Sequence, residues 1–190
     1  MLDSYNAIGI GPGIDTHHQT VQLVQVLLST STQPLVLDAD AINILSEHPE
    51  LIAKIPKNTI LTPHIKEFDR LVGRAKNSTE RIEKLQAFTK KHHCIIVLKD
   101  AYTCISSPDG NLYYNTSGNQ GMATGGSGDV LTGIIVALLA QQYTPLEAAC
   151  LGVYFHGKAG DQAVKTKSYA SLIASDIIEC IDIKHTKLPC

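Results

Sequence analysis

The 190-residue chain is 44% hydrophobic and 18% charged, with a formal net charge of −2, which is typical of one globular domain over 1–190. The near-neutral charge argues against a nucleic-acid-binding protein, and the helix-length apolar run at 130–140 is shorter than the ~20 residues that cross a bilayer. Five cysteines without a Cys-x-x-Cys pair indicate neither a zinc site nor a disulfide framework, and the first residues lack the pattern of a signal peptide. These features favour a cytoplasmic protein without a membrane or nucleic-acid partner.

A glycine turn joins the first predicted strand to the first predicted helix. Apolar residues before Gly11 predict a short strand, and apolar residues at helical spacing predict a helix over 16–28. Gly11, Pro12 and Gly13 lie between them. At the carboxyl end of a parallel strand such a turn lies where open sheets bind ligands. The alternative is a tight turn that only connects two elements.

Two carboxylates follow the second predicted strand, at 34–37. Asp38 and Asp40 are two residues apart, so an extended chain would place both side chains on one face. Paired carboxylates there suit proton transfer, metal binding or recognition of a hydroxyl. The alternative is that Asp40 caps a helix over 41–46.

A third strand, turn and helix are predicted over 58–68, where Thr62, Pro63 and His64 form the turn. This order puts His64 at the same edge of the sheet as the two preceding motifs. A histidine in a loop is otherwise commonly just solvated, so both interpretations stay open.

The next region combines a surface helix, a buried strand and a hairpin. Asn77 and Glu80 suit a capping box for an amphipathic helix over 77–91. The apolar run at 94–98 predicts a strand that is covered on both faces and ends at Lys99. Segments 103–106 and 112–115 flank a turn at 107–110, which predicts a β-hairpin beginning at Thr103. Lys99 is either a phosphate contact or a solvated lysine.

The glycine-rich stretch at 118–129 leads directly into the apolar run at 130–140. Glycine permits positive φ and close approach to the backbone, and a helix that begins in such a loop offers free N–H groups to an anion, most often a phosphate. Asp129 would repel that anion unless it acts as a base on an attacking hydroxyl. The alternative is that Asp129 only satisfies N–H groups of the first turn. The spacing matches neither a P-loop nor a dinucleotide-binding Gly-x-Gly-x-x-Gly.

Two further helices are expected after this loop. Thr144, Pro145 and Glu147 predict the start of a helix that extends to about residue 164 and contains His156, which is either a core residue or a contact of the nucleotide base. A last helix is predicted over 171–183. The alternation of strands and helices predicts an α/β domain with a largely parallel sheet covered on both faces.

The stretch GMATGGSGDVL at 121–131 resembles the signature of the ADP/ATP-dependent NAD(P)H-hydrate dehydratases, a branch of the ribokinase-like superfamily. The turn at 11–13, the stretch DADA at 38–41, LTPH at 61–64, and the lysine and threonine at 99 and 103 are also similar to motifs of that family. The resemblance extends over 7–181. It implies a ribokinase-like three-layer α/β/α sandwich that lacks the N-terminal βα units with which family members begin.

The resemblance also implies roles for individual residues. Asp129 is implied to be the catalytic base and to contact the substrate, NAD(P)H hydrate. Further substrate contacts are implied at Gly11, Gly13, Asp38 and His64. The nucleotide and its phosphates are implied to bind Lys99, Thr103, Thr124, Gly125, Gly126, Ser127 and Gly128. ADP or ATP is the implied co-substrate, with Mg²⁺ accompanying the nucleotide and no dedicated protein metal site.

The expected activity is nucleotide-dependent dehydration of NAD(P)H hydrate, through phosphorylation of the ring hydroxyl and loss of phosphate. One alternative is a ribokinase-like kinase for a small alcohol such as a vitamin precursor. Another is a truncated fragment that binds nucleotide without turnover. Apolar edges left by missing strands favour a homo-oligomer. The resemblance further implies fusion to, or cooperation with, an NAD(P)H-hydrate epimerase.

Overall fold

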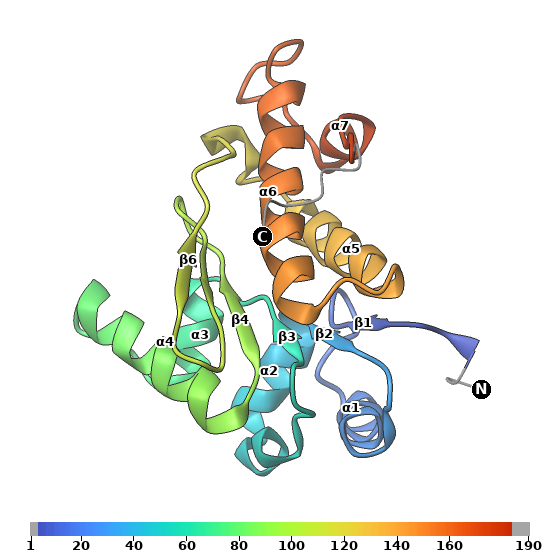
Figure 1. Ribbon diagram of the computed structural model, residues 1–190, viewed down its shortest axis with the longest axis vertical. Helices are drawn as coiled ribbons and strands as arrows, with labels where there is room; N and C mark the ends of the chain where they lie inside the picture. Colours follow the sequence, from blue (N-terminus) through green and yellow to red (C-terminus); the bar gives the residue numbers. More distant parts are fainter. Residues whose placement is uncertain (1–3, 184–190) are drawn as a thin grey trace.

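A computed structural model describes residues 4–183 and shows a six-stranded sheet between two layers of helices (Figure 1). The strands follow the chain order across the sheet. They are β1 (Ile8–Ile10), β2 (Leu35–Leu37), β3 (Ile60–Leu61), β4 (Ile95–Leu98), β5 (Cys104–Ser106) and β6 (Leu112–Tyr114). The first four strands are parallel, whereas β5 and β6 pair antiparallel as the predicted hairpin. The predicted mostly parallel sheet is therefore confirmed.

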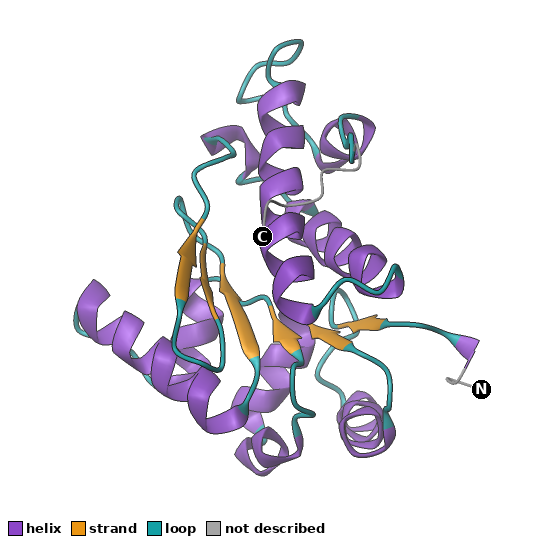
Figure 2. Ribbon diagram, in the orientation of Figure 1, coloured by secondary structure: helices purple, strands orange, loops and turns teal. Residues whose placement is uncertain are grey.

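Helices cover both faces of this sheet (Figure 2). One layer contains α1 (His18–Thr30), α2 (Ala39–Glu47), α3 (Ile65–Val72) and α4 (Ser78–His92), and the other contains α5 (Ser127–Ala140), α6 (Pro145–Ala163) and α7 (Ala174–Glu179). Short 3₁₀ helices occupy Pro49–Lys54 and Gln120–Met122. The three-layer α/β/α arrangement follows because each face of the sheet must bury its apolar side chains.

The strand side chains alternate between the two cores with the period of two that a pleated strand imposes. In β4, Ile96 and Leu98 pack in the core beneath α1–α4, whereas Ile95 and Val97 pack beneath α5 and α6. All four are buried. This two-sided burial explains why the strand is a continuous apolar run in the sequence.

The predicted helix starts at 77 and 144 are confirmed by their caps. The Asn77 side chain accepts a hydrogen bond from the Glu80 N–H, and Thr144 forms a complete capping box with Glu147. The last helix is shorter than predicted, because α7 covers only Ala174–Glu179 of the expected 171–183. Residues 171 and 172 lie outside this helix, and Ile173 is its N-cap.

Gly133 lies in the middle of α5 on an exposed position, and a Cβ added there would meet nothing within 4 Å. Gly133→Ala should raise the free energy of unfolding by about 1 kcal/mol, because alanine loses less backbone entropy in a helix than glycine. Chemical denaturation of the two proteins measures the difference. A destabilised variant would show that this stretch of α5 is not helical or that its outer face is covered.

Candidate active site

Four of the predicted site residues meet at one edge of the sheet, where the parallel strands end. Gly11 follows β1, Asp38 follows β2, His64 follows β3 and Lys99 follows β4. The N-terminus of α5 reaches the same edge, because Thr132 and Gly128 approach Asp38. The carboxyl edge of a parallel sheet is where open α/β folds bind their ligands, so these groups form the candidate site.

A buried carboxylate lies at the centre of this edge. Asp38 is 1% exposed, and one of its oxygens lies 2.8 Å from Lys99 Nζ. The other oxygen accepts a hydrogen bond of 2.8 Å from Thr132 Oγ1 of α5. The interaction links the ends of β2 and β4 to the second turn of α5. It therefore fixes the Lys99 ammonium beneath the start of that helix.

Asp38 and Asp40 do not share a face, so that prediction is wrong. α2 begins at Ala39, whose φ of 44° turns the chain directly after the strand. The Asp40 side chain instead reaches the loop between β1 and α1, where it accepts a hydrogen bond of 3.0 Å from the Asp15 N–H. The suggested helix cap at Asp40 is also wrong, because Asp38 occupies the N-cap position and makes no side-chain cap bond.

Gly11 and Gly13 differ in their surroundings. Gly11 has a φ of 140° and is buried, and a Cβ on it would lie 1.7 Å from the Asp38 carbonyl oxygen. Only glycine allows the β1 turn to approach Asp38 so closely. Gly13 has a φ of 65°, is exposed, and faces open space. It is thus available to a ligand, whereas Gly11 shapes the floor of the site.

His64 combines a local structural role with a place in the site. Its Nδ1 accepts a hydrogen bond from the Glu67 N–H, and Glu67 in turn caps the His64 N–H, which starts α3. The His64 side chain stays 48% exposed. His64 pairs with Lys99 in an isolated parallel bridge, and both residues line a cavity of about 350 Å³ together with Ile65, Lys66 and Asp100. The predicted substrate contact and the predicted phosphate contact are therefore neighbours.

The glycine-rich loop leads directly into α5, as predicted. Gly126 is the N-cap with a φ of 82°, a left-handed conformation that favours glycine. Within residues 4–183, the backbone N–H groups of Gly125, Gly126, Gly128 and Asp129 make no hydrogen bond. Four free donors at the positive end of a 14-residue helix suit a phosphate group.

The side chain of Asp129 is exposed at this helix start and makes no hydrogen bond or ion pair with the described residues. The alternative in which it satisfies first-turn N–H groups is therefore wrong. Thr124 accepts a hydrogen bond from the Ser127 N–H through its carbonyl, which closes the loop. Thr103 donates its hydroxyl to the Asp100 carbonyl at 3.4 Å, at the start of the hairpin.

Two further residues contribute to the site: Thr132 was not predicted, and the role of His156 was left open. Thr132 lies one turn beyond Asp129 in α5 and bonds Asp38. The one sequence signal for this bond is that a polar residue stands within the apolar run at 130–140. His156 of α6 approaches Ser127, with 3.2 Å between Nε2 and Oγ. Burial lowers the pKa of His156 to about 4, against the effect of a hydrogen bond with the Ser127 backbone, which raises it, and together with the Lys99 charge. This imidazole is therefore neutral near pH 7.

No group of three or more histidine, cysteine, aspartate or glutamate side chains in the described part of the chain is arranged to hold a metal ion. The Asp38 carboxylate is already bound by an ammonium and a hydroxyl. A protein-based Mg²⁺ cage is therefore not offered by these residues. No helix within residues 4–183 is long and apolar enough to cross a membrane.

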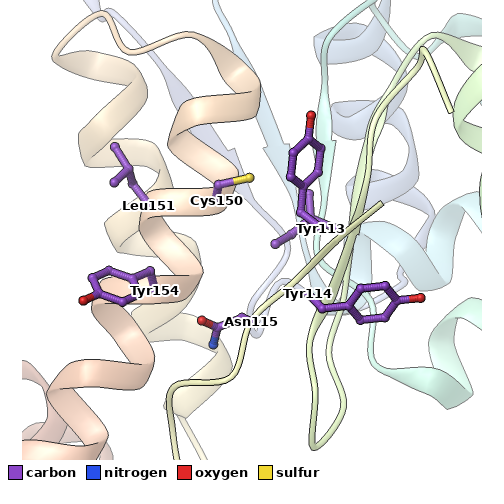
Figure 3. A pocket seen from close by; sticks show the side chains of 7 residues that line it. Tyr113, Tyr114, Asn115, Cys150, Leu151 and Tyr154 are labelled. Carbon is purple, nitrogen blue, oxygen red and sulfur yellow. The ribbon is translucent and has the colours of Figure 1, made fainter. Parts of the chain in front are cut away.

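A second cavity, of about 270 Å³, lies between the hairpin and α6 (Figure 3). Its lining has no charged side chain and consists of Ile105, Tyr113, Tyr114, Asn115, Cys150, Leu151 and Tyr154. None of the predicted site residues contributes to it. The lack of charge makes this cavity unsuited to a phosphate.

Gly128 is the residue of the glycine-rich loop that lies against Lys99. A Cβ there would lie 3.2 Å from Lys99 Nζ and 4.0 Å from an Asp38 oxygen. Gly128→Ala should therefore displace the ammonium and weaken ADP or ATP binding about tenfold, the loss expected for one charge-assisted hydrogen bond. Gly133→Ala, farther along α5 and outside the candidate site, is the matched control, because a Cβ at Gly133 meets nothing within 4 Å. Calorimetric titration compares the two, and equal affinities would contradict the close packing of Lys99 on Gly128.

Comparison with known proteins shows that this chain is similar to one family of enzymes. A family model described as NAD(P)H-hydrate dehydratase matches residues 1–182. An ADP-dependent (S)-NAD(P)H-hydrate dehydratase from Neisseria meningitidis is 42% identical over 178 residues, which cover 90% of this chain and 60% of that protein. A bifunctional NAD(P)H-hydrate repair enzyme from Moorella thermoacetica is 41% identical over 180 residues, which cover 94% of this chain and 34% of that protein.

A solved structure shares the fold. The ADP/ATP-dependent NAD(P)H-hydrate dehydratase from Bacillus subtilis, co-crystallised with ATP and Mg²⁺, superimposes with a TM-score of 0.80 at 34% sequence identity. The match covers 93% of this chain and 64% of that one. The expected ribokinase-like fold is confirmed. This chain spans about a third of the bifunctional relative and less than two thirds of the Neisseria and Bacillus dehydratases.

Proposed function

The chain belongs to the NAD(P)H-hydrate dehydratase family, and on this premise we propose that it restores NADH or NADPH from the hydrated nucleotide, using ADP or ATP. The observation that carries the proposal is the arrangement at the start of α5. Four free N–H groups and the Lys99 ammonium lie beside an exposed carboxylate that has no partner among the described residues. An anion site with an adjacent base is what phosphoryl transfer to a hydroxyl requires.

The terminal phosphate of the nucleotide binds at this helix start. The N–H groups of Gly125, Gly126 and Gly128 donate to its oxygens, and Lys99 adds a positive charge from below. These donors are fixed before the ligand arrives, because Asp38 holds Lys99 and the positive φ of Gly126 sets the loop. Fixed donors stabilise the charge that builds up on the transferred group without reorganisation.

The reaction then uses Asp129. Its carboxylate takes the proton from the ring hydroxyl of the hydrate while the hydroxyl oxygen attacks the terminal phosphorus, and AMP or ADP leaves. The ring carbon–oxygen bond of the phosphate ester breaks next. Inorganic phosphate departs with the bonding electrons, a proton leaves the neighbouring ring carbon, and the dihydronicotinamide double bond is restored.

The substrate occupies the adjoining edge of the sheet. The exposed His64 side chain and the cavity beside Lys99 provide one side, and the exposed turn at Gly13 provides the other. Gly11 and Asp38 shape the floor between them. Mg²⁺ is expected to arrive with the nucleotide phosphates, since the described residues offer no metal cage of their own.

Association with other chains is a separate part of the proposal. The bifunctional relatives join a similar segment to further sequence, and we expect this protein to work with an NAD(P)H-hydrate epimerase. We also expect a homo-oligomer, because β1 and β6 are edge strands of the described sheet. Light scattering on the purified protein measures its mass.

The test mixes the purified protein with NADH hydrate, Mg²⁺ and either ADP or ATP, and follows the absorbance of the dihydronicotinamide. We expect recovery of NADH that depends on the nucleotide. Release of a stable phosphorylated alcohol instead would favour a ribokinase-like kinase. Thermal stabilisation by nucleotide without either product would indicate a binding fragment without turnover or a kinase of another alcohol. No stabilisation would contradict the anion site itself.

A further inference from the structure

His156 and Ser127 form a contact between α6 and the first residue of α5. Their side chains are 29 positions apart in sequence, and Nε2 lies 3.2 Å from Oγ. Ser127 is only 5% exposed, although it belongs to the loop that offers its N–H groups to an anion. The contact therefore reaches the candidate phosphate site from the helix layer behind it.

The Ser127 hydroxyl has one proton and therefore donates one hydrogen bond at a time. Its backbone N–H is already used by the Thr124 carbonyl, and His156 is the partner of its side chain among the described residues. Gly128, the next residue, lies against Lys99. For a phosphate bound beside this hydroxyl, the direction of the serine proton would decide whether Ser127 offers it a donor.

The imidazole is neutral under ordinary conditions. Burial lowers the pKa of His156 to about 4, although a hydrogen bond with the Ser127 backbone raises it, and the nearby Lys99 charge acts in the same direction as burial. A neutral imidazole has one N–H and one bare nitrogen, and the tautomer determines which of them faces Ser127. If Nε2 were bare, it would accept the serine proton and take it away from the anion.

We propose that His156 is a positioning residue that donates Nε2–H to Ser127 Oγ and so directs the serine proton to the phosphate of the bound nucleotide. The proposal rests on the proposed function, because the anion is the terminal phosphate of ADP or ATP. The serine then adds a charge-assisted hydrogen bond to those of the backbone N–H groups. His156 itself does not touch the substrate.

A double-mutant cycle on nucleotide binding tests this relay. Ser127→Ala and His156→Leu should each raise the dissociation constant of ADP or ATP roughly 10- to 100-fold, because each removes the oriented donor. In the Ser127→Ala background, His156→Leu should have no further effect. His156→Gln should restore most of the affinity, because its amide nitrogen lies as far along the side chain as Nε2 and also donates. Thermal unfolding of each variant checks that it is folded.

The tautomer provides an independent readout. Nitrogen-15 NMR of the His156 ring should show Nε2 protonated and Nδ1 bare in the wild-type protein. Additive effects in the cycle, or a bare Nε2, would overturn the proposal while wild-type binding of nucleotide left the proposed function intact. If the wild-type protein bound neither ADP nor ATP, the proposed function would fall, and the phosphate-directed role of His156 with it.

Discussion

Asp129→Asn is expected to lower turnover by ~10²–10⁴-fold while the dissociation constants of ADP and ATP stay close to those of the wild type. The amide keeps the size of the side chain but does not accept the proton of the attacking hydroxyl. Binding is spared because the carboxylate is exposed and holds no other group among the described residues. The measurement is steady-state NADH recovery together with calorimetric titration of nucleotide.

Glu83→Gln is the matched control for the loss of one carboxylate. Glu83 is an exposed residue of α4, in the opposite helix layer, and its removal should leave both rate and affinity unchanged. Near-native turnover of Asp129→Asn would show that another group takes the proton. Tighter nucleotide binding with turnover intact would indicate that Asp129 only repels the phosphate.

Asp38→Asn is expected to destabilise the fold by about 2–3 kcal/mol and to weaken nucleotide binding at the same time. Removing one member of a buried ion pair leaves the other charge without compensation, which commonly costs 3–5 kcal/mol, and the 22% exposure of the Lys99 side chain reduces that figure. Chemical denaturation measures the stability and titration measures the affinity. The two effects share one cause, since Asp38 both neutralises the charge of the Lys99 ammonium and holds it in position.

The control for this substitution is Asp40→Asn, two residues along the chain. Asp40 is partly exposed, and within residues 4–183 it binds only the Asp15 N–H and the Asn43 amide, so its loss should cost about 1 kcal/mol or less. A Lys99→Met substitution in the Asp38→Asn background should recover part of the stability, because the unpaired charge is then gone. If Asp38→Asn were as stable as the wild type, the ion pair would not be formed in solution.

The order of strands and helices could be predicted because local patterns determine it. The apolar run at 95–98 and the cap at Thr144 each specify an element without reference to the rest of the chain. The meeting of Gly11, Asp38, His64 and Lys99 also followed from sequence, since the ends of parallel strands share one edge. The positions of these four residues in the sheet are as expected, and their roles stay proposals.

The orientation of side chains at the strand ends could not be predicted. Ala39 adopts a φ of 44° and begins α2 one residue after the strand, so Asp38 and Asp40 diverge, although their spacing suggested a common face. Nothing in the local sequence signals that turn. The bonds from Thr132 to Asp38 and from His156 to Ser127 span 94 and 29 residues, and such contacts depend on how the helices pack.

The central claim is that the ring hydroxyl of the hydrate is phosphorylated at the start of α5 and leaves as part of the phosphate. Hydrate prepared with oxygen-18 in that hydroxyl, incubated with the protein and ADP or ATP, tests this most directly. The account predicts that the inorganic phosphate formed with each NADH carries one oxygen-18 atom, as measured by mass spectrometry. Oxygen-18 released as water, with unlabelled phosphate, would contradict it.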